Sequence, residues 1–182
     1  MNGGVLVCTL QVNAPPGSDQ FVVQTYDNTN LTLASIVSAA TFAQTINAVG
    51  LNILNVVTNP VPFNINVAGL SSGIHVAASG ATALPITFQD ADGLSFTGAF
   101  DAPIMLSLSS PSSHYTLSKA TWSGTADSAS IVADSTTPSG STTVTLTFTP
   151  GSSQQSNNGG FCPKPSGSCG ATVSTTFNVT TP

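Results

Sequence analysis

Charged residues are nearly missing from this sequence. Its 182 residues include two lysines and seven aspartates but no arginine or glutamate, and charged side chains make up 5%. An average soluble domain has roughly 25%. Two lysines cannot neutralise a row of phosphates, so the composition argues against nucleic-acid binding. The scarcity of trypsin cleavage sites, with a net charge of −5, favours a protein that is exposed outside the cell.

Long apolar runs are missing too. No stretch of about 20 apolar residues is present, so we expect no insertion into a membrane. Apolar residues still make up 40% of the chain, and disordered chains are typically poor in them and rich in charge. Serine and threonine number 25 each. Once membrane and disordered proteins are excluded, the composition indicates a globular protein with few charges. The chain is long enough for one large domain or two small ones.

Only three cysteines are present, and two of them lie seven residues apart. Cys162 and Cys169 flank a turn-rich segment, and this spacing lets a disulfide close a small loop in an oxidising compartment. Cys8 has no obvious partner, which indicates an intermolecular or missing partner or a buried thiol. A zinc site needs further Cys or His at matched spacing, whereas His75 and His114 stand alone.

Apolar and polar residues alternate through the first 60 residues, which predicts strands rather than helices. The Ala-rich stretch 35–47 has β-branched residues and no charged face, so we interpret it as strand as well. Pro60 and Pro62 interrupt the pattern and mark a boundary after a small first unit, residues 1–60. The strands expected in this unit span residues 5–12, 21–26, 31–38, 41–46 and 51–58.

A second unit is expected over residues 61–182, where turn signals recur about every 8–12 residues, as is typical of a β-sandwich. Between Val144 and Thr149 apolar residues alternate with threonine, which predicts a strand with one buried face. The expected strands span residues 63–67, 74–78, 84–88, 94–98, 104–108, 115–117, 129–133, 142–149 and 171–179. The expected core residues are Phe88, Phe96, Ile104, Leu106, Trp122, Leu146 and Phe148.

Two stretches resemble a known group of proteins. Residues 8–27 are similar to a pattern repeated in bacterial secreted and surface proteins built of tandem Ig-like or transthyretin-like β-sandwich modules. Residues 86–93, followed by 103–108, look like the Ig-like module that usually comes next. The resemblance implies an all-β chain of two modules, a structural role at the cell surface and no catalytic residue. In similar chains a further strand precedes the first cysteine, so we expect the first module to be short of strands.

Asp90, Asp92 and Asp101 are the one group of carboxylates that suggests a metal site. Asp-Ala-Asp-Gly can begin a calcium loop, because alternate carboxylates on a turn converge on one cation. An EF-hand needs a third oxygen ligand at position 94, which is leucine, and a glutamate later in the loop. We therefore favour a hairpin turn in which Asp bonds to its own backbone and Gly93 has positive φ. No metal and no cofactor are expected.

No catalytic constellation stands out. The chain has no Gly-x-Ser-x-Gly turn for a serine nucleophile, and its aspartates lie in expected turns rather than across a cleft. We therefore predict that the chain is not an enzyme. Tyr26, Tyr115 and Trp122 would offer a stacking platform for a glycan, although a single tryptophan more often fills a sandwich core.

Two functions remain open. The first is a structural subunit of an extracellular assembly, such as a filament, a pilus-like fibre or a surface layer, that associates with copies of itself through strand edges. An uncharged surface packs against copies with little charge desolvation, and an open sheet edge invites a strand from a neighbour. The expected pairing segment, residues 3–12, contains the apolar side chains of Val5, Leu6, Val7, Leu10 and Val12. The alternative is a stalk or adhesin module of a secreted surface protein that binds a glycan.

Overall fold

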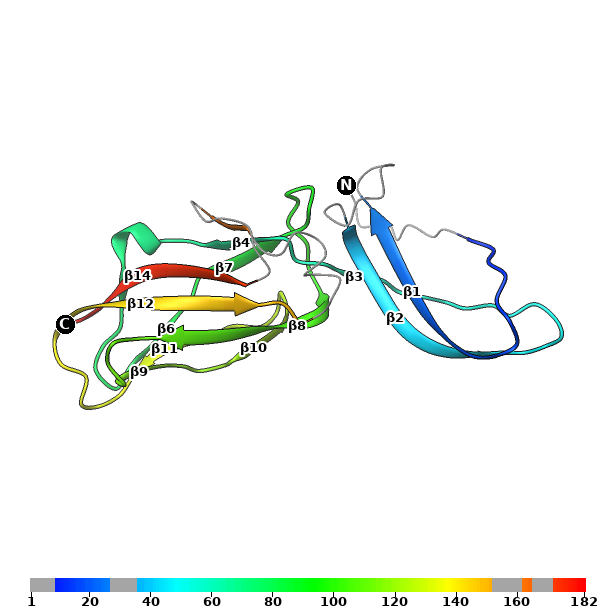
Figure 1. Ribbon diagram of the computed structural model, residues 1–182. Helices are drawn as coiled ribbons and strands as arrows, with labels where there is room; N and C mark the ends of the chain where they lie inside the picture. The colour runs from blue at the N-terminus through cyan, green and yellow to red at the C-terminus, as the bar shows by residue number, and fades with distance from the viewer. Residues whose placement is uncertain (1–8, 27–35, 152–161, 165–171) are drawn as a thin grey trace.

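The protein is all-β, as predicted (Figure 1). The computed structural model describes residues 9–26, 36–151, 162–164 and 172–182, with the backbone alone described for 162–164. These residues contain one 3-10 turn, Leu70–Ser72, and no helix of seven or more residues. None of their helices is long and apolar enough to cross a membrane.

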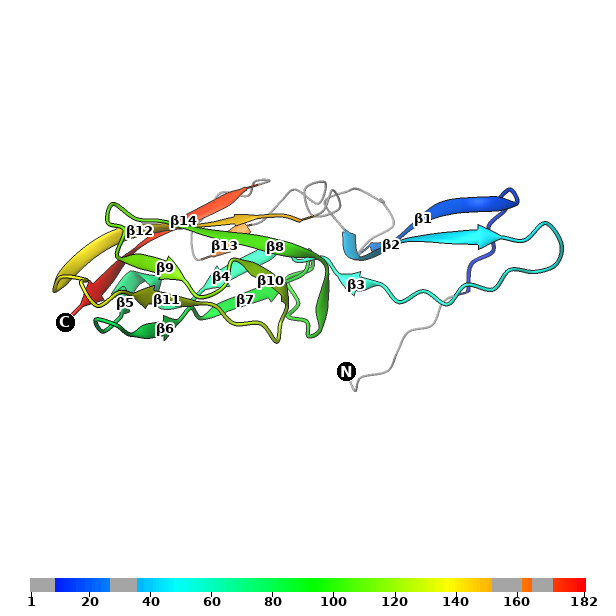
Figure 2. The ribbon, with the colours of Figure 1, turned by 90° about the horizontal axis from the view of Figure 1, so that it is seen from below.

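The N-terminal sheet, with strand order β1-β2-β3, is built around one hairpin. β1 (Gly17–Tyr26) and β2 (Ile36–Ile46) pair antiparallel, with Phe21 opposite Phe42. β3 (Asn59–Pro60) adds only two residue pairs on the other side of β2. In Figures 1 and 2 this sheet projects from one end of the remaining strands, and the C-terminus lies at the opposite end.

The other strands form two layers, which we call the two-layer part (Figure 2). One layer is a five-stranded sheet of order β10-β8-β12-β14-β5, and the other consists of the sheets β6-β11-β9 and β13-β4-β7. Their bounds are β4 (Asn64–Val67), β5 (Ile74–His75), β6 (Ala81–Ala83), β7 (Ile86–Gln89), β8 (Ala99–Ser109), β9 (Tyr115–Leu117), β10 (Thr121–Gly124), β11 (Ser130–Ala133), β12 (Gly140–Thr149), β13 (Cys162–Lys164) and β14 (Val173–Thr181).

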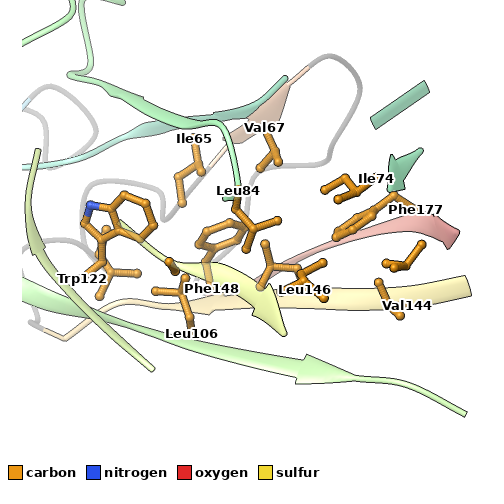
Figure 3. Close-up of a cluster of buried hydrophobic side chains, with 14 of the residues drawn as sticks. Ile65, Val67, Ile74, Leu84, Leu106, Trp122, Val144, Leu146, Phe148 and Phe177 are labelled. Carbon is orange, nitrogen blue, oxygen red and sulfur yellow. The ribbon is translucent and has the colours of Figure 1, made fainter. Parts of the chain in front are cut away.

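One hydrophobic cluster lies between the two layers and draws side chains from both (Figure 3). Along β12, alternate apolar residues are buried and the threonines between them are not, as the sequence pattern predicts. Trp122 of β10 packs edge-on against Phe88 of β7 with ring centroids 5.5 Å apart, which joins the layers. The expected core residues are buried except Phe96, which is partly buried against the cluster.

The outer face of the five-stranded sheet carries a ladder of hydroxyl groups. Thr145 and Thr176 share a hydrogen bond of 3.2 Å between β12 and β14, and Thr147 and Ser174 share one of 2.8 Å. Threonine suits such a face because its branched side chain fits a pleated surface while its hydroxyl pairs across strands. The ladder gives β12 and β14 a polar but uncharged outer side.

Several strand predictions near the N-terminus are wrong in detail. The predicted strands 31–38 and 41–46 belong, where they are described, to the single strand β2. Residues 9–12 and 51–58 form no strand, although their apolar and polar residues alternate. Alternation indicates that a segment suits a sheet, but a strand exists only where a neighbour supplies hydrogen bonds.

Further differences lie in the two-layer part, where β6 and β13 were not predicted. Residues 94–98 form no strand, only an isolated bridge between Gln89 and Ser95. β10 was not predicted, because its four residues include a serine and a glycine and resemble a turn. It becomes a strand by pairing with β8, a contact that the local sequence does not encode.

The N-terminal sheet meets the two-layer part where β3 lies against β8. A small cluster of Ile36, Ala39 and Val61, with Tyr26 against it, is buried at the start of β2. Among the residues that the structure describes, the large cluster starts at Ile65. The predicted division into units at residues 60 and 61 stays a prediction, and so do the Ig-like and transthyretin-like assignments.

Candidate assembly surface

Exposed apolar side chains are concentrated around the N-terminal sheet. Among the described residues, only two large apolar side chains of the two-layer part are exposed, those of Leu94 and Met105. The other exposed side chains of this kind are those of Leu10, Val12, Val22, Val49, Leu51, Ile53, Val56 and Val57. No aspartate or lysine occurs between residues 28 and 89. An exposed apolar region of this kind is typical of an interaction surface.

The exposure follows from the architecture of the N-terminal sheet. Phe21 and Phe42 stack on each other at 5.5 Å across the hairpin, and both are only partly buried. Val22, on the other face of β1, is exposed. No second layer of strands covers this sheet among the residues that the structure describes. A three-stranded sheet alone buries little apolar surface, so it gains from covering by another element.

β2 has an incompletely paired edge. On the side away from β1 it pairs with β3 only at Ser38 and Ala39. The same register would place Thr58 opposite Ala40, but the chain leaves β2 there and residues 51–58 run on without forming a strand. Within the described ranges, no strand pairs with residues 42–46 of β2 on this side.

A groove of about 310 Å³ lies between β2 and segment 55–59 and is open to solvent. Apolar side chains from both walls line it, and Asp101 of β8 lies at its border with the two-layer part. The lining residues are Ala39, Ala40, Thr41, Phe42, Asn55, Val56, Val57, Asn59 and Asp101. The groove therefore combines a strand edge with a lining of mixed character, in which polar surface exceeds apolar surface.

The predicted pairing segment is only partly described. Val5, Leu6, Val7 and Cys8 lie outside the described residues. Leu10 and Val12 are 84% and 64% exposed and lie in no strand, so the predicted strand is wrong for residues 9–12. Residues 9–13, which we call the donor segment, are thus an uncharged, exposed stretch with two apolar side chains.

The carboxylates considered for calcium form a turn instead. The Leu94 amide donates to the Asp90 carboxylate at 2.9 Å, and the Gly93 amide donates to the Asp90 carbonyl at 3.0 Å. Gly93 has φ 78°, the left-handed conformation expected for glycine in this turn. Asp101 lies in β8, away from this turn in the chain. No group of three or more His, Cys, Asp or Glu that could hold a metal occurs among the described residues.

His114 and Asp134 form a hydrogen-bonded cluster between two loops. His114 Nδ1 lies 3.0 Å from Asp134 Oδ2, and the Thr136 amide and hydroxyl both donate to Asp134 Oδ1. The His114 hydrogen bond, with bonds from Thr136 and Thr137, lowers the pKa of Asp134 to about 2. The contacts join the chain before β9 to the chain after β11, which is a structural role.

Lys119 and Asp127 form an ion pair next to β10. The Asp127 carboxylate also accepts a hydrogen bond from the Ser123 amide. The Lys119 hydrogen bond is the main cause that lowers the pKa of Asp127. This pair joins the chain on either side of β10.

Trp122 lies in the core, as predicted, and not on the aromatic sugar platform that was the alternative for this residue. Trp122 is 3% exposed and lies in the core with Tyr115, so neither ring can stack on a ligand at the surface (Figure 3). Tyr115 instead shares a buried hydrogen bond of 2.8 Å with Thr181. Tyr26 is partly buried, and its hydroxyl donates to Gln24. The aromatic rings thus stabilise the fold.

The predicted disulfide is not tested. Cys169 lies outside the described residues, and only the backbone of Cys162 is described. That backbone belongs to β13, which pairs in parallel with β4. The chain matches no protein-family model, and no curated protein is detectably similar to it in sequence.

The groove and the exposed residues 49–57 were not predicted. Their sequence signal is an alternating apolar stretch, residues 51–58, that carries no charge. This signal favoured an ordinary strand, since alternation alone does not say which edge a segment pairs with. The candidate surface therefore consists of the donor segment, the open edge of β2 and the groove beside it.

Proposed function

We propose that this chain is a non-enzymatic structural subunit of an extracellular assembly, such as a filament, a pilus-like fibre or a surface layer, in which copies associate through β-strand edges. The observation that carries the proposal is the N-terminal sheet, whose flanking segments expose apolar residues and whose strand β2 has an open edge. Open edges of this kind pair with other chains unless something blocks them.

The surface lacks the usual protection against such pairing. Natural proteins guard exposed edges with lysine, proline or inward-pointing charges. No lysine occurs before residue 119, and residues 40–46 of β2 contain neither proline nor a charged residue. Association with copies of the same chain therefore brings few charges together and removes apolar surface from water.

The exposed segment and the open edge are different surfaces of one chain. Contacts between two different surfaces are heterologous, and they generate open chains of subunits unless the rotation between subunits closes a ring. This favours a filament over a closed dimer. The extracellular location is supported by the scarcity of lysine and arginine and by the spacing of Cys162 and Cys169.

Deleting residues 1–12 tests the proposal. We expect the full chain to associate as its concentration rises and to form ordered fibres or sheets in negative-stain images, and the truncated chain to stay monomeric in sedimentation velocity. Leu94→Asp, which changes an exposed leucine of the two-layer part, is the control and should assemble normally. A full chain that stays monomeric at high concentration would refute the proposal and leave the stalk or adhesin module in its place.

A further inference from the structure

We propose that the groove between β2 and segment 55–59 is the acceptor site for the donor segment, residues 9–13, of a second copy of this chain. The inference rests on the proposed function and adds the contact through which copies join. An extended segment inserted here adds a strand to β2, the mode known as β-augmentation.

The acceptor offers a strand edge. Residues 42–46 of β2 pair with β1 on one side and with no described strand on the other. Residues 51–58 run on the far side of the groove without forming a strand. An inserted strand therefore has β2 on one side and a second extended segment on the other. Main-chain hydrogen bonds would supply affinity, and side-chain pockets would supply specificity.

The donor segment fits the site in length and volume. Five extended residues span roughly 17 Å, so residues 9–13 can pair along residues 42–46 of β2, a stretch that begins in the groove at Phe42 and continues beyond it. Alternation places Leu10 and Val12 on the same face of the inserted strand. The groove, at about 310 Å³, is twice the volume of a cavity that holds one benzene, which is about 150 Å³. It thus has room for two aliphatic side chains beside Ala40, Phe42 and Val57.

The charge pattern also suits a copy of this chain. The donor segment has no charged residue, and its polar side chains are hydroxyl and amide groups. Among the residues that line the groove, only Asp101 carries charge, at the border with β8. A neutral, alternating strand enters such a site without bringing a charge out of water, whereas a strongly charged peptide would lose solvation.

The segment of the same chain is not placed to fill the groove. Leu10 is 84% exposed, and no residue of the donor segment lines the groove. The segment leads through Pro15 and Pro16 into β1, which pairs with the opposite edge of β2. In the described chain the donor segment therefore leaves the groove unfilled, and a second copy can supply the occupant.

Two charge substitutions with matched controls test the contact. Leu10→Asp puts a charge on the face of the donor segment that enters the groove, and Gln11→Asp puts it on the opposite face. Val57→Asp puts a charge in the groove, and Val49→Asp changes an equally exposed valine outside it. We expect Leu10→Asp and Val57→Asp to lose assembly, and both controls to assemble like the wild type, in sedimentation velocity and negative-stain images.

Mixing the two defective variants is the decisive measurement. Leu10→Asp retains an intact groove and Val57→Asp retains an intact donor segment, so an equimolar mixture should form dimers of twice the monomer mass and no fibres. Loss of assembly in Leu10→Asp with normal assembly in Val57→Asp would overturn the groove as acceptor while leaving the proposed function intact. If Gln11→Asp or Val49→Asp also fails to assemble, or if the mixture stays monomeric, the groove is not the acceptor site. A wild-type chain that never assembles refutes both proposals.

Discussion

Leu146 illustrates how much stability a single core residue of the two-layer part provides. Its side chain is fully buried between the layers (Figure 3). We expect Leu146→Ala to lower the free energy of unfolding by about 2–5 kcal/mol, because it removes apolar contacts and leaves a cavity. Urea denaturation measures this change. Thr145→Ala, on the outer face of the same strand, should cost about 1 kcal/mol or less, the range of one cross-strand pair, and equal losses would mean that β12 faces the other way.

Asp134 makes stability depend on acid pH. Its folded pKa of about 2, held low mainly by the hydrogen bond with His114, is below the value of about 3.9 for an unfolded aspartate. The carboxylate therefore stabilises the fold above about pH 4, and this contribution is lost as the pH falls toward 2. We expect Asp134→Asn to lower Tm at pH 7, with the difference from wild type shrinking between pH 4 and 2. A difference that does not change with pH would contradict this cause.

At the scale of elements, β10 depends on a glycine. A Cβ at Gly124 would lie 2.6 Å from the Gly98 carbonyl oxygen and 3.0 Å from the Ala99 Cα, both backbone atoms next to or in β8. Gly124→Ala therefore pushes β10 away from β8 and disturbs the packing of Trp122. We expect a loss of about 1–3 kcal/mol in thermal or urea unfolding. Ser123→Ala, an exposed neighbour, is the control and should be nearly neutral.

Pairing between elements explains the unusual behaviour of segment 51–58. Its sequence suits a strand, and the register set by β3 would bring it along β2. It instead remains apart and leaves apolar side chains in solvent, which is costly for an isolated chain. A strand inserted between this segment and β2 gives both a partner, so the proposed assembly accounts for an element that is incomplete in one molecule.

At the scale of the whole molecule, the two-layer part should fold without the donor segment. The large core cluster begins at Ile65 and includes none of the described residues that precede it. Trp122 is the single tryptophan and is buried there, so its fluorescence reports on this part alone. We expect deletion of residues 1–12 to leave its blue-shifted emission and its thermal transition unchanged. A red-shifted emission in the truncated chain would show that the segment is needed for folding rather than for association.

Local sequence determined much of this protein. The all-β class, the buried face of β12 and the turn after Asp90 follow from alternation and from the turn chemistry of aspartate and glycine, which act within a few residues. Most of the expected core residues were predictable for the same reason, since a strand with one apolar face must bury it.

Only the tertiary structure decided which segments pair. β10 becomes a strand through β8, and segment 51–58 forms no strand beside β2. Each outcome depends on contacts between residues far apart in the chain, for which alternation carries no information. The groove has the same origin, because it lies where β2 continues beyond its pairing with β3 and segment 55–59 forms its other wall.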